Sequence, residues 1–265
     1  MKKYLVIGNP IEHSLSPKLH NYWIKENNLN ASYEKKLIEK SEIKGIIDDL
    51  KNNKISGINV TVPFKAQVIP FLNKLTPVSQ ETGSVNTIYK LNDEIVGDNT
   101  DVDGFCAALK KTQYNFKSKK AFILGAGGVA PSIICALKKV GISNISLSNR
   151  TREKSEILKK KFTDLKLVNW GETTNADIII NATSLGLKEN DEIKLDYSTI
   201  GSNKLFYDVI YNPSETKFLL NAKKLNNKIE NGKLMFIYQA QLAFKIWHNV
   251  LPKIDDNILN LMDHD

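Results

Sequence analysis

Apolar runs of strand length alternate along the chain with segments whose apolar residues recur at helical spacing. Residues 57–62, for example, are rich in β-branched side chains and end at Pro63, a pattern typical of a strand. The apolar runs predict strands at residues 4–8, 57–62, 85–89, 94–97, 121–124, 144–148, 176–181 and 205–209. The helical segments are residues 16–27, 130–140, 152–162 and 235–250. This alternation predicts an α/β fold with parallel sheets.

The same pattern gives a first indication of how the chain is divided. Two expected strands, residues 85–89 and 94–97, flank Asn92-Asp93 and predict a short hairpin. A second strand–helix–strand pattern begins after residues 101–109, so we expect a domain boundary in that segment. At roughly 100–200 residues per domain, the chain has room for one large domain or two modest ones.

A glycine-rich turn follows the expected strand 121–124 and precedes the expected helix. Its sequence, Gly125-Ala126-Gly127-Gly128-Val129-Ala130, has the G-x-G-x-x-A form of a dinucleotide-binding turn. Gly125 would allow the tight turn, Gly127 would let the backbone approach a pyrophosphate, and Ala130 is small enough for close packing of helix on sheet. The helix N-terminus would then present N–H groups and partial positive charge to the phosphates. A purely structural turn is the alternative interpretation.

The end of the next expected strand indicates which dinucleotide would bind. An NAD site usually has Asp or Glu there, about 20 residues after the glycines. This chain instead has Ser148-Asn149-Arg150-Thr151-Arg152-Glu153-Lys154, with no carboxylate at the strand end. The guanidinium of Arg150 could bind a 2′-phosphate with two donors, and the neighbouring polar and basic residues would add to the site. The alternative is a solvated basic helix start, but a cation there opposes the helix dipole. The pattern favours NADP over NAD.

Three polar clusters lie outside the glycine turn. In the first, Ser14 and Ser16 could present two hydroxyls to a carboxylate, beside a helix that begins near Pro17. Such a Ser-x-Ser-Pro segment is also an ordinary helix cap. The second cluster, residues 59–65, would place Asn59 and Thr61 on one strand face.

The second cluster ends in a lysine, and the third supplies a possible partner. Lys65 would follow the carboxyl end of its strand, where ligands gather in α/β sheets, and a lysine there can donate or accept a proton. A solvated surface lysine is the alternative. The third cluster contains Asn86-Thr87 and Asp98-Asn99-Thr100-Asp101, of which Asp101 could pair with Lys65 and orient it.

Composition excludes several classes of protein. The mix of 42% apolar and 25% charged residues is that of a globular protein, and no apolar stretch reaches the roughly 20 residues of a membrane span. The first apolar run is too short for a signal peptide, and two cysteines cannot form a disulfide scaffold, so we expect a cytoplasmic protein. The four histidines, His13, His20, His248 and His264, lack the spacing of a metal site.

The formal net charge of +8 raises the question of nucleic-acid binding. The lysines are scattered, however, with no dense basic arm and no interleaved aromatic residues. Solvated helix faces explain them better, and we expect no nucleic-acid partner. A positive field would still help to gather an anionic substrate and cofactor.

Taken together, these segments resemble the shikimate dehydrogenase family. The matching stretches are residues 8–10, 13–17, 20–21, 59–65, 83–87, 97–101, 104, 125–128, 149–151, 181–186, 208, 211–213, 232, 235 and 239–240. They occur in order from residue 8 to about residue 240, which makes the resemblance far more specific than any single motif.

The resemblance implies the reversible reduction of 3-dehydroshikimate to shikimate by NADPH, in aromatic amino acid and chorismate biosynthesis. It implies that Lys65 and Asp101 form the catalytic pair, with Lys65 transferring the proton. The substrate-binding residues that it implies are Ser14, Ser16, Thr61, Asn86, Tyr211 and Gln239. Among these, the serines would hold the carboxylate with the threonine close by, and the two amide side chains, with Asp101, would bind ring hydroxyls.

The resemblance also implies a set of cofactor-binding residues. Those that would cradle the pyrophosphate are Gly125, Ala126, Gly127, Gly128 and Val129. Those that would read the 2′-phosphate are Asn149, Arg150, Thr151, Arg152 and Lys154. Val209 and Gly232 would meet the nicotinamide through their backbone. No metal is implied, and the protein would act as a monomer or homodimer.

Two domains follow from the resemblance. Residues 1–101 plus about 235–265 would form an α/β substrate-binding catalytic domain, and about 102–234 a Rossmann-like NADP-binding domain with a parallel sheet. Two residues depart from the family pattern. Pro77 stands where many relatives have an acidic residue near the cofactor, and Leu234 stands where glycine is common.

Two alternatives remain open. One is a quinate/shikimate dehydrogenase of the same family with relaxed use of NAD and NADP; the intact Ser14/Ser16 pair and Asn149-Arg150-Thr151 argue for the biosynthetic, NADP-specific type. The other is a non-catalytic regulatory protein that binds NADP. Such a protein would be expected to have lost Lys65 or Asp101, and both are present.

Overall fold

The computed structural model describes residues 1–188 and 190–263, so His264 lies outside the described residues. The chain forms two compact units, Met1–Gly104 with Ile237–Asp265, and Phe105–Phe236. The division falls within two continuous helices, α4 (Asp101–Lys111) and α9 (Lys233–His248). The predicted divisions, at residue 101 and near residue 235, lie in the first turns of the same two helices.

The first unit contains a six-stranded mixed sheet of order β2-β1-β3-β5-β6-β4. Its strands are β1 (Lys2–Gly8), β2 (Ala31–Leu37), β3 (Gly57–Val60), β4 (Lys74–Leu75), β5 (Thr87–Leu91) and β6 (Glu94–Asp98). The predicted hairpin is β5–β6, an antiparallel pair whose turn residues Asn92 and Asp93 both have positive φ, at 48° and 64°. The sheet is therefore not wholly parallel, because this hairpin joins it through the antiparallel β3–β5 pair.

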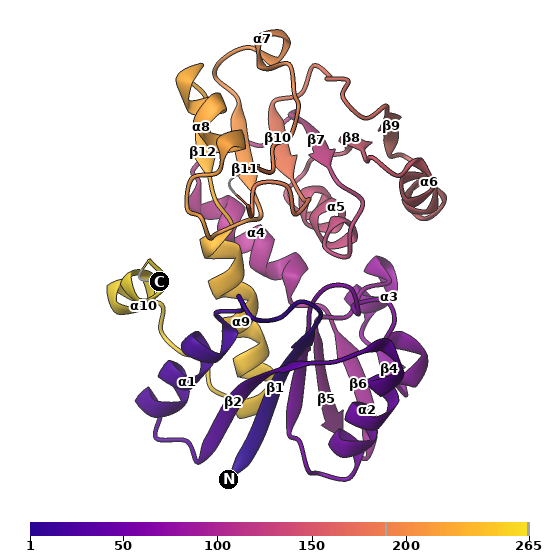
Figure 1. Cartoon of the computed structure of the whole chain (residues 1–265), viewed down its shortest axis with the longest axis vertical. Coiled ribbons are helices and arrows are strands. Elements are labelled where there is room, and N and C mark those ends of the chain that lie inside the picture. The colour runs from indigo at the N-terminus through magenta and orange to yellow at the C-terminus, as the bar shows by residue number, and fades with distance from the viewer. Residues whose placement is uncertain (189, 264–265) are drawn as a thin grey trace. The chain divides into compact units, whose positions relative to one another are not determined.

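Helices cover both faces of this sheet (Figure 1). The helices of this unit, besides its part of α9, are α1 (Ser16–Glu26), α2 (Ile43–Lys51), α3 (Pro77–Thr82) and α10 (Asp256–Leu261), with the 3-10 turns η1 (Lys40–Glu42) and η2 (Ile69–Phe71). Pro77 occupies the first turn of α3, where its missing N–H costs no helical hydrogen bond. Leu234 lies in the first turn of α9, and its departure from the family pattern interrupts no element.

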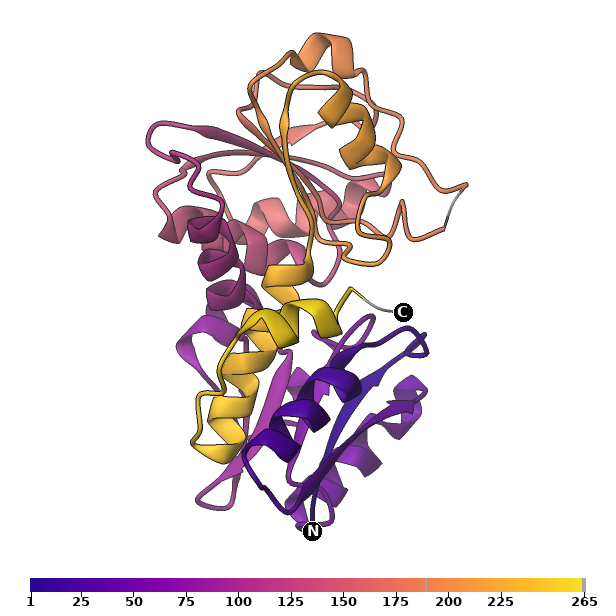
Figure 2. The same ribbon diagram turned by 90° about the vertical axis from the view of Figure 1, so that its left-hand side faces the viewer.

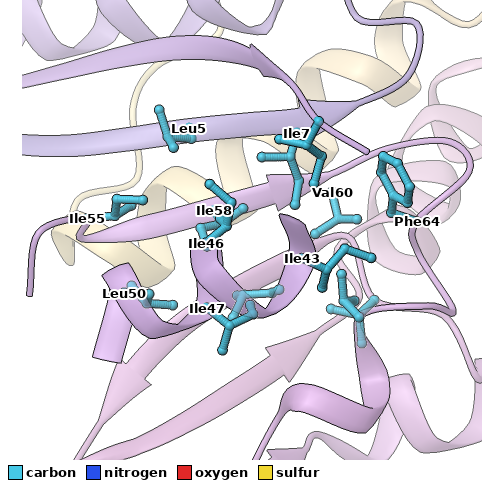
Figure 3. Packing of buried hydrophobic residues seen from close by; sticks show 14 of the residues in the cluster. Leu5, Ile7, Ile43, Ile46, Ile47, Leu50, Ile55, Ile58, Val60 and Phe64 are labelled. Atoms are coloured by element: carbon cyan, nitrogen blue, oxygen red, sulfur yellow. The ribbon is translucent and has the colours of Figure 1, made fainter. Parts of the chain in front are cut away.

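Strand β1 shows how the two faces of the sheet are filled. Successive side chains of a strand point to opposite faces, so Leu5 and Ile7 join α2 and β3 in one apolar cluster (Figure 3). Tyr4 instead contacts the rings of Trp247 and His248 on α9, so α1 and α9 lie on the face opposite α2 (Figure 2). The alternation along one strand therefore places the aromatic cluster and the aliphatic core on opposite sides.

The second unit contains a six-stranded sheet in which all pairs are parallel. Its strands are β7 (Lys120–Leu124), β8 (Asn144–Ser148), β9 (Lys166–Val168), β10 (Ile178–Asn181), β11 (Leu205–Asp208) and β12 (Lys228–Glu230). The order β12-β11-β10-β7-β8-β9 is the doubly wound order 3-2-1-4-5-6 read from the other end. In such sheets ligands bind where the order reverses, here beyond the carboxyl ends of β7 and β10. The predicted Rossmann-like sheet is confirmed.

The helices of the second unit are α5 (Ala130–Lys139), α6 (Arg152–Lys161), α7 (Tyr197–Ile200) and α8 (Lys217–Lys224). Residues from β7, β10, β11 and α8 form one buried cluster, which includes Phe122, Ile179, Phe206 and Phe218. Helix α5 buries every residue from Ala130 to Leu137. Within the described part of the chain, no helix combines the length and apolar character needed to cross a bilayer.

Candidate active site

In the first unit, strand pairing gathers polar side chains at one edge of the sheet. Asn59 on β3 pairs with Thr87 on β5, and Thr87 pairs with Asp98 on β6.

Strand β3 ends at Val60, two residues before the predicted end. Thr61 donates its N–H to Ile7, but its carbonyl accepts from Phe64 at 2.9 Å, so the chain turns there. The predicted strand was therefore two residues too long, and Thr61 lies just beyond the end of β3.

A buried ion pair occupies this edge. Lys65 Nζ lies 2.6 Å from Asp101 Oδ2, and the two side chains are 11% and 6% exposed. Asp101 begins α4, where the helix dipole stabilises a negative charge. Asn99 Oδ1 accepts from the Asp101 N–H at 3.0 Å and so holds the start of the helix. The predicted pairing of Lys65 with Asp101 is observed, and the alternative of a solvated surface lysine is excluded.

Asn86 joins the ion pair to helix α9. Its Nδ2 donates to Asp101 Oδ1 at 2.8 Å and to Gln239 Oε1 at 3.3 Å. Its Oδ1 accepts from the Thr100 N–H at 2.8 Å. The structure therefore brings together Lys65, Asp101, Asn86 and Gln239, although 153 residues separate Asn86 from Gln239. Amide, carboxylate and ammonium groups side by side suit a ligand that is rich in hydroxyls.

The two predicted serines flank the start of α1. The N-cap residue is Leu15, so neither serine occupies the capping position itself. Ser14 Oγ accepts only a long bond, 3.4 Å, from the Ser16 N–H. Ser14 is partly buried and Ser16 is buried. Two hydroxyls next to a helix N-terminus are suited to hold a carboxylate.

In the second unit, the glycine turn begins where β7 ends. Gly125 has φ of +110°, and a Cβ there would lie 2.9 Å from the Ala182 carbonyl, so only glycine fits. A Cβ at Gly127 would approach nothing closer than the Ala182 carbonyl oxygen at 3.9 Å, which leaves open space beside that backbone. Helix α5 follows, and its N-cap residue Val129 makes no side-chain cap bond. These features fit a pyrophosphate at the helix N-terminus.

The segment after β8 is fixed to the glycine turn by Asn149. Its Oδ1 accepts from the Ala126 N–H at 2.9 Å, and its Nδ2 donates to the Thr151 carbonyl at 2.7 Å. Arg150 and Lys154 are exposed, and so is Thr151, the N-cap residue of α6, which makes no side-chain cap bond. Asn149 therefore braces the loop against the glycine turn.

Arg152 differs from Arg150 in its contacts. Its Nε donates to Glu156 Oε1 at 2.9 Å, one turn further along α6, and its guanidinium reaches Asn169 Oδ1 at 3.5 Å. This pair is half exposed and contributes little to stability. Arg150 is therefore better placed than Arg152 to bind an external anion.

Val209 and Gly232 lie against each other through their backbones. A Cβ at Gly232 would lie 2.1 Å from the Val209 carbonyl oxygen and 2.5 Å from its carbonyl carbon. The Gly232 N–H donates to the Ile210 carbonyl at 3.0 Å. Tyr211, one residue further, stacks on Phe236 with ring centroids 4.7 Å apart. These three predicted site residues belong to the second unit, whereas Lys65 and its neighbours belong to the first.

We expect Gly232→Ala to lower the free energy of unfolding by about 1–3 kcal/mol, the usual cost of overpacking. The new methyl group would meet backbone atoms, which cannot rotate away as a side chain can. Urea unfolding measures the change. Gly45→Ala on α2 is the matched control, because a Cβ there meets nothing within 4 Å. Equal stability of the two variants would contradict the prediction.

Sequence reasoning assigned no role to Asp208, a fully buried carboxyl group at the end of β11. Burial raises the pKa of Asp208 to about 6, although bonds from Thr216, Ile210 and Asn181 lower it in part. Thr216 Oγ1 donates at 2.6 Å and Asn181 Nδ2 at 3.0 Å. This network holds the loops that follow β10 and β11. The sequence did contain a signal for this residue, because an acidic residue at the end of an apolar strand indicates a buried polar network.

Sequence reasoning also gave no role to Tyr33, a buried residue of β2. Its strand is mostly exposed and polar, so the pattern of apolar residues did not indicate a strand there.

Among residues 1–188 and 190–263, no group of three or more His, Cys, Asp or Glu side chains is arranged to hold a metal ion. Cys106 and Cys135 are both buried.

Comparison with known proteins gives the family. Residues 6–88 match the model of the shikimate dehydrogenase substrate binding domain, and residues 107–193 match that of shikimate / quinate 5-dehydrogenase. The chain is 58% identical over 262 residues to the shikimate dehydrogenase (NADP(+)) of Pelagibacter ubique, covering 99% of both chains.

Solved structures agree with this match. Shikimate dehydrogenase from Aquifex aeolicus is similar with a TM-score of 0.91 and 38% identity, over 100% of this chain and 98% of that one. Shikimate 5-dehydrogenase from Thermus thermophilus, in complex with NADP(H) and shikimate, is similar with a TM-score of 0.89 and 30% identity, over 99% and 98%. With such identity over its whole length, the chain belongs to the shikimate dehydrogenase family.

Proposed function

We propose that this protein catalyses the reversible, NADPH-dependent reduction of 3-dehydroshikimate to shikimate, a step of aromatic amino acid and chorismate biosynthesis. The Pelagibacter relative, at 58% identity, is a shikimate dehydrogenase that uses NADP(+). The observation that carries the proposal is the buried Lys65–Asp101 pair with Asn86 beside it. A non-catalytic NADP-binding protein would have no use for an ammonium group buried in this way.

In this proposal, the first unit binds the substrate. Ser14 and Ser16 hold its carboxylate, with Thr61 close by. Asn86, Asp101 and Gln239 bind the ring hydroxyls, and Tyr211 is a further proposed substrate contact. The support is that the three ring-binding side chains already form one hydrogen-bonded group. Buried donors and acceptors of this kind reject analogues that leave them unpaired.

Lys65 is the proposed proton-transfer residue. During reduction, negative charge grows on the oxygen of the reacting carbonyl, and a protonated Lys65 stabilises that charge and then delivers a proton to the oxygen. In the reverse direction the Lys65 amine accepts the proton of the substrate hydroxyl. Asp101 orients the amine, which is supported by the 2.6 Å separation of Nζ and Oδ2. NADP, when bound, supplies or accepts the hydride.

The residues proposed for NADP suit its groups. The turn Gly125-Ala126-Gly127-Gly128-Val129 leaves space at Gly127 and ends at a helix N-terminus, as a pyrophosphate requires. Val209 and Gly232 are the backbone positions proposed to meet the nicotinamide. Arg150, Thr151 and Lys154 are exposed beside the turn and carry the donors for a 2′-phosphate. Arg152 adds positive charge nearby.

A spectrophotometric assay of nicotinamide reduction tests the proposal. We expect shikimate to reduce NADP+, and much lower catalytic efficiency with quinate or with NAD+. No shikimate-dependent reduction would overturn the proposed function. Comparable efficiency with quinate and with NAD+ would instead indicate the relaxed quinate/shikimate type.

Arg150→Ala should raise the Michaelis constant for NADPH by roughly 10-fold or more, the value of a charge-assisted hydrogen bond. The Michaelis constant for NADH should change little, because NADH has no 2′-phosphate. Lys160→Ala, which removes an exposed cation from the same region of the unit, is the control. An equal effect of Arg150→Ala on both cofactors would remove Arg150 from 2′-phosphate recognition.

We also propose a cytoplasmic enzyme that acts as a monomer or homodimer and has no nucleic-acid or membrane partner. The membership of a metabolic enzyme family supports this setting. Light scattering coupled to gel filtration measures the oligomeric state, and a larger assembly would contradict this part of the proposal.

A further inference from the structure

Tyr33 connects three parts of the first unit. Its ring is 2% exposed and stacks on the His20 ring, with centroids 4.2 Å apart and an interplanar angle of 3°. Its hydroxyl donates to Asn59 Oδ1 at 2.7 Å and also makes a hydrogen bond with the Ser16 side chain. One phenol therefore touches both a serine proposed to hold the substrate carboxylate and the amide at the end of β3.

The bond from Tyr33 fixes which way the Asn59 amide faces. Because Oδ1 accepts from the phenol, Nδ2 must point the other way, and it donates to the Asn86 carbonyl at 3.0 Å and to Thr87 Oγ1 at 3.1 Å. Asn59 is 6% exposed and Thr87 is 0% exposed, so water does not compete for these bonds. In such a site each amide has one orientation that satisfies its partners.

The direction of donation continues to the ion pair. Thr87 Oγ1, having accepted from Asn59, donates to Asn86 Oδ1 at 3.0 Å. Asn86 Oδ1 also accepts from the Thr100 N–H at 2.8 Å, and both bonds leave Asn86 Nδ2 to donate to Asp101 Oδ1 at 2.8 Å. Asp101 then presents its second oxygen, Oδ2, to Lys65 Nζ. A continuous chain of donors and acceptors therefore runs from Tyr33 to Lys65.

We propose that Tyr33 is a positioning residue, whose hydroxyl helps to hold the Asn59 amide in its orientation and, through Thr87, supports the position of Asn86, Asp101 and Lys65. This inference rests on the proposed function. Without the hydroxyl, the Asn59 amide loses one of the two bonds that distinguish its orientations, the other being the donation of Nδ2 to the Asn86 carbonyl. A turned amide would place an oxygen against the Asn86 carbonyl, which is repulsive, and the side chains downstream would lose their fixed geometry. Ser16 would lose its phenol partner at the same time.

Tyr33→Phe tests the inference because it removes the hydroxyl and keeps the ring on His20. We expect the catalytic efficiency for shikimate to fall roughly 10-fold, as for loss of one buried hydrogen bond. A lower turnover number and a higher Michaelis constant for shikimate should both contribute to this fall. The Michaelis constant for NADP+ should change less than about twofold. Tyr4→Phe is the matched control: Tyr4 is also buried and contacts Trp247 and His248, but it is not a link of this chain.

A double-mutant cycle separates positioning from general stability. In an Asn59→Ala background, Tyr33→Phe should have little further effect on the turnover number, because the link from Tyr33 to the ion pair is already gone; the Tyr33 bond to Ser16 bears on the Michaelis constant for shikimate. Additive losses would overturn the inference, and so would a Tyr33→Phe enzyme with wild-type kinetics. If Tyr33→Phe does not fold, Thr87→Val breaks a later link with nearly the same shape, and wild-type kinetics of that variant would overturn the inference.

The failures of the two proposals are distinguishable. A wild-type protein that does not oxidise shikimate with NADP+ overturns the proposed function itself. An active wild-type protein whose efficiency is unchanged in Tyr33→Phe overturns only the positioning role.

Discussion

Replacing Lys65 by alanine should lower the turnover number for shikimate oxidation by on the order of 10³-fold, within the range contributed by a general acid or base. The ammonium group is buried and lies 2.6 Å from Asp101 Oδ2. The substitution removes the proposed proton donor and leaves Asp101 without the ammonium group that it pairs with. Steady-state kinetics with shikimate and NADP+ measure the loss. Binding of NADP+, followed by titration calorimetry, should remain near the wild-type value.

The control must separate lost chemistry from lost stability. Removing one partner of a buried ion pair can cost about 3–5 kcal/mol, because the other charge stays buried without compensation. Asn86 and the start of α4 stabilise the Asp101 carboxylate in part. Thermal unfolding is therefore measured beside turnover. Lys3→Ala, which breaks the exposed pair with Glu34, is the matched control and should keep normal turnover. Near-normal turnover of Lys65→Ala would remove Lys65 from the mechanism.

Lowering the pH from 7 to 5 should destabilise the first unit by about 2 kcal/mol through His20 alone. Burial lowers the pKa of His20 to about 3, and the nearby His248 lowers it further. An unfolded chain binds this proton near pH 6.5, so protonation favours unfolding. The contribution of neutral His20 is fully present above pH 6.5 and is lost as the pH falls toward 3.

Two other buried groups modify this pH dependence. Burial lowers the pKa of His248 to about 4, with a further contribution from Lys2, so His248 adds to the loss in acid. Asp208 in the second unit has the opposite sign, because burial raises its pKa to about 6. The folded second unit takes up that proton before the unfolded chain does, and is stabilised as the pH falls from about 6 toward 3.8. Acid should therefore weaken the first unit more than the second.

Urea unfolding at pH 7 and pH 5, followed by tryptophan fluorescence, measures the effect. Trp23 and Trp247 pack around His20, so they report on the first unit. His20→Phe keeps a flat ring against Tyr33 but cannot bind a proton, and it should lose about 2 kcal/mol less than the wild type between the two pH values. His13→Gln at an exposed site is the control. An equal loss in His20→Phe and in the wild type would contradict the prediction.

Much of the fold could be predicted because it follows from local interactions. The predicted strand at residues 144–148 coincides with β8, and the predicted helix at residues 152–162 with α6, Arg152–Lys161. The glycine turn was predictable because a positive φ at Gly125 and a close backbone approach are properties of the residue itself. Asn92-Asp93 predicted the hairpin for the same reason, since Asn and Asp tolerate positive φ.

The sequence analysis did not predict several elements, most of which depend on their neighbours for stability. Strands β4, β9 and β12 have only two or three residues each, too few for any periodicity, and pairing at the sheet edges holds them. Helix α2 was also missed, although its apolar face of Ile43, Ile46, Ile47 and Leu50 is regular. The predicted strand at residues 57–62 was two residues longer than β3. Its β-branched residues continue past the strand end, and only the hydrogen bonds of the folded chain show that a turn begins there.

By itself, the sequence determined the α/β class, the glycine turn with a basic segment after the next strand, and Lys65 and Asp101 as candidate partners. Only the tertiary structure decided which polar groups meet. It tied Asn149 to the glycine turn, paired Arg152 with Glu156, and joined Asn86 to Gln239 across 153 residues. Periodicity shows which face of an element is buried, but not which residue of another strand or helix lies opposite. Sheet register and helix packing select those partners, and they depend on the whole chain at once.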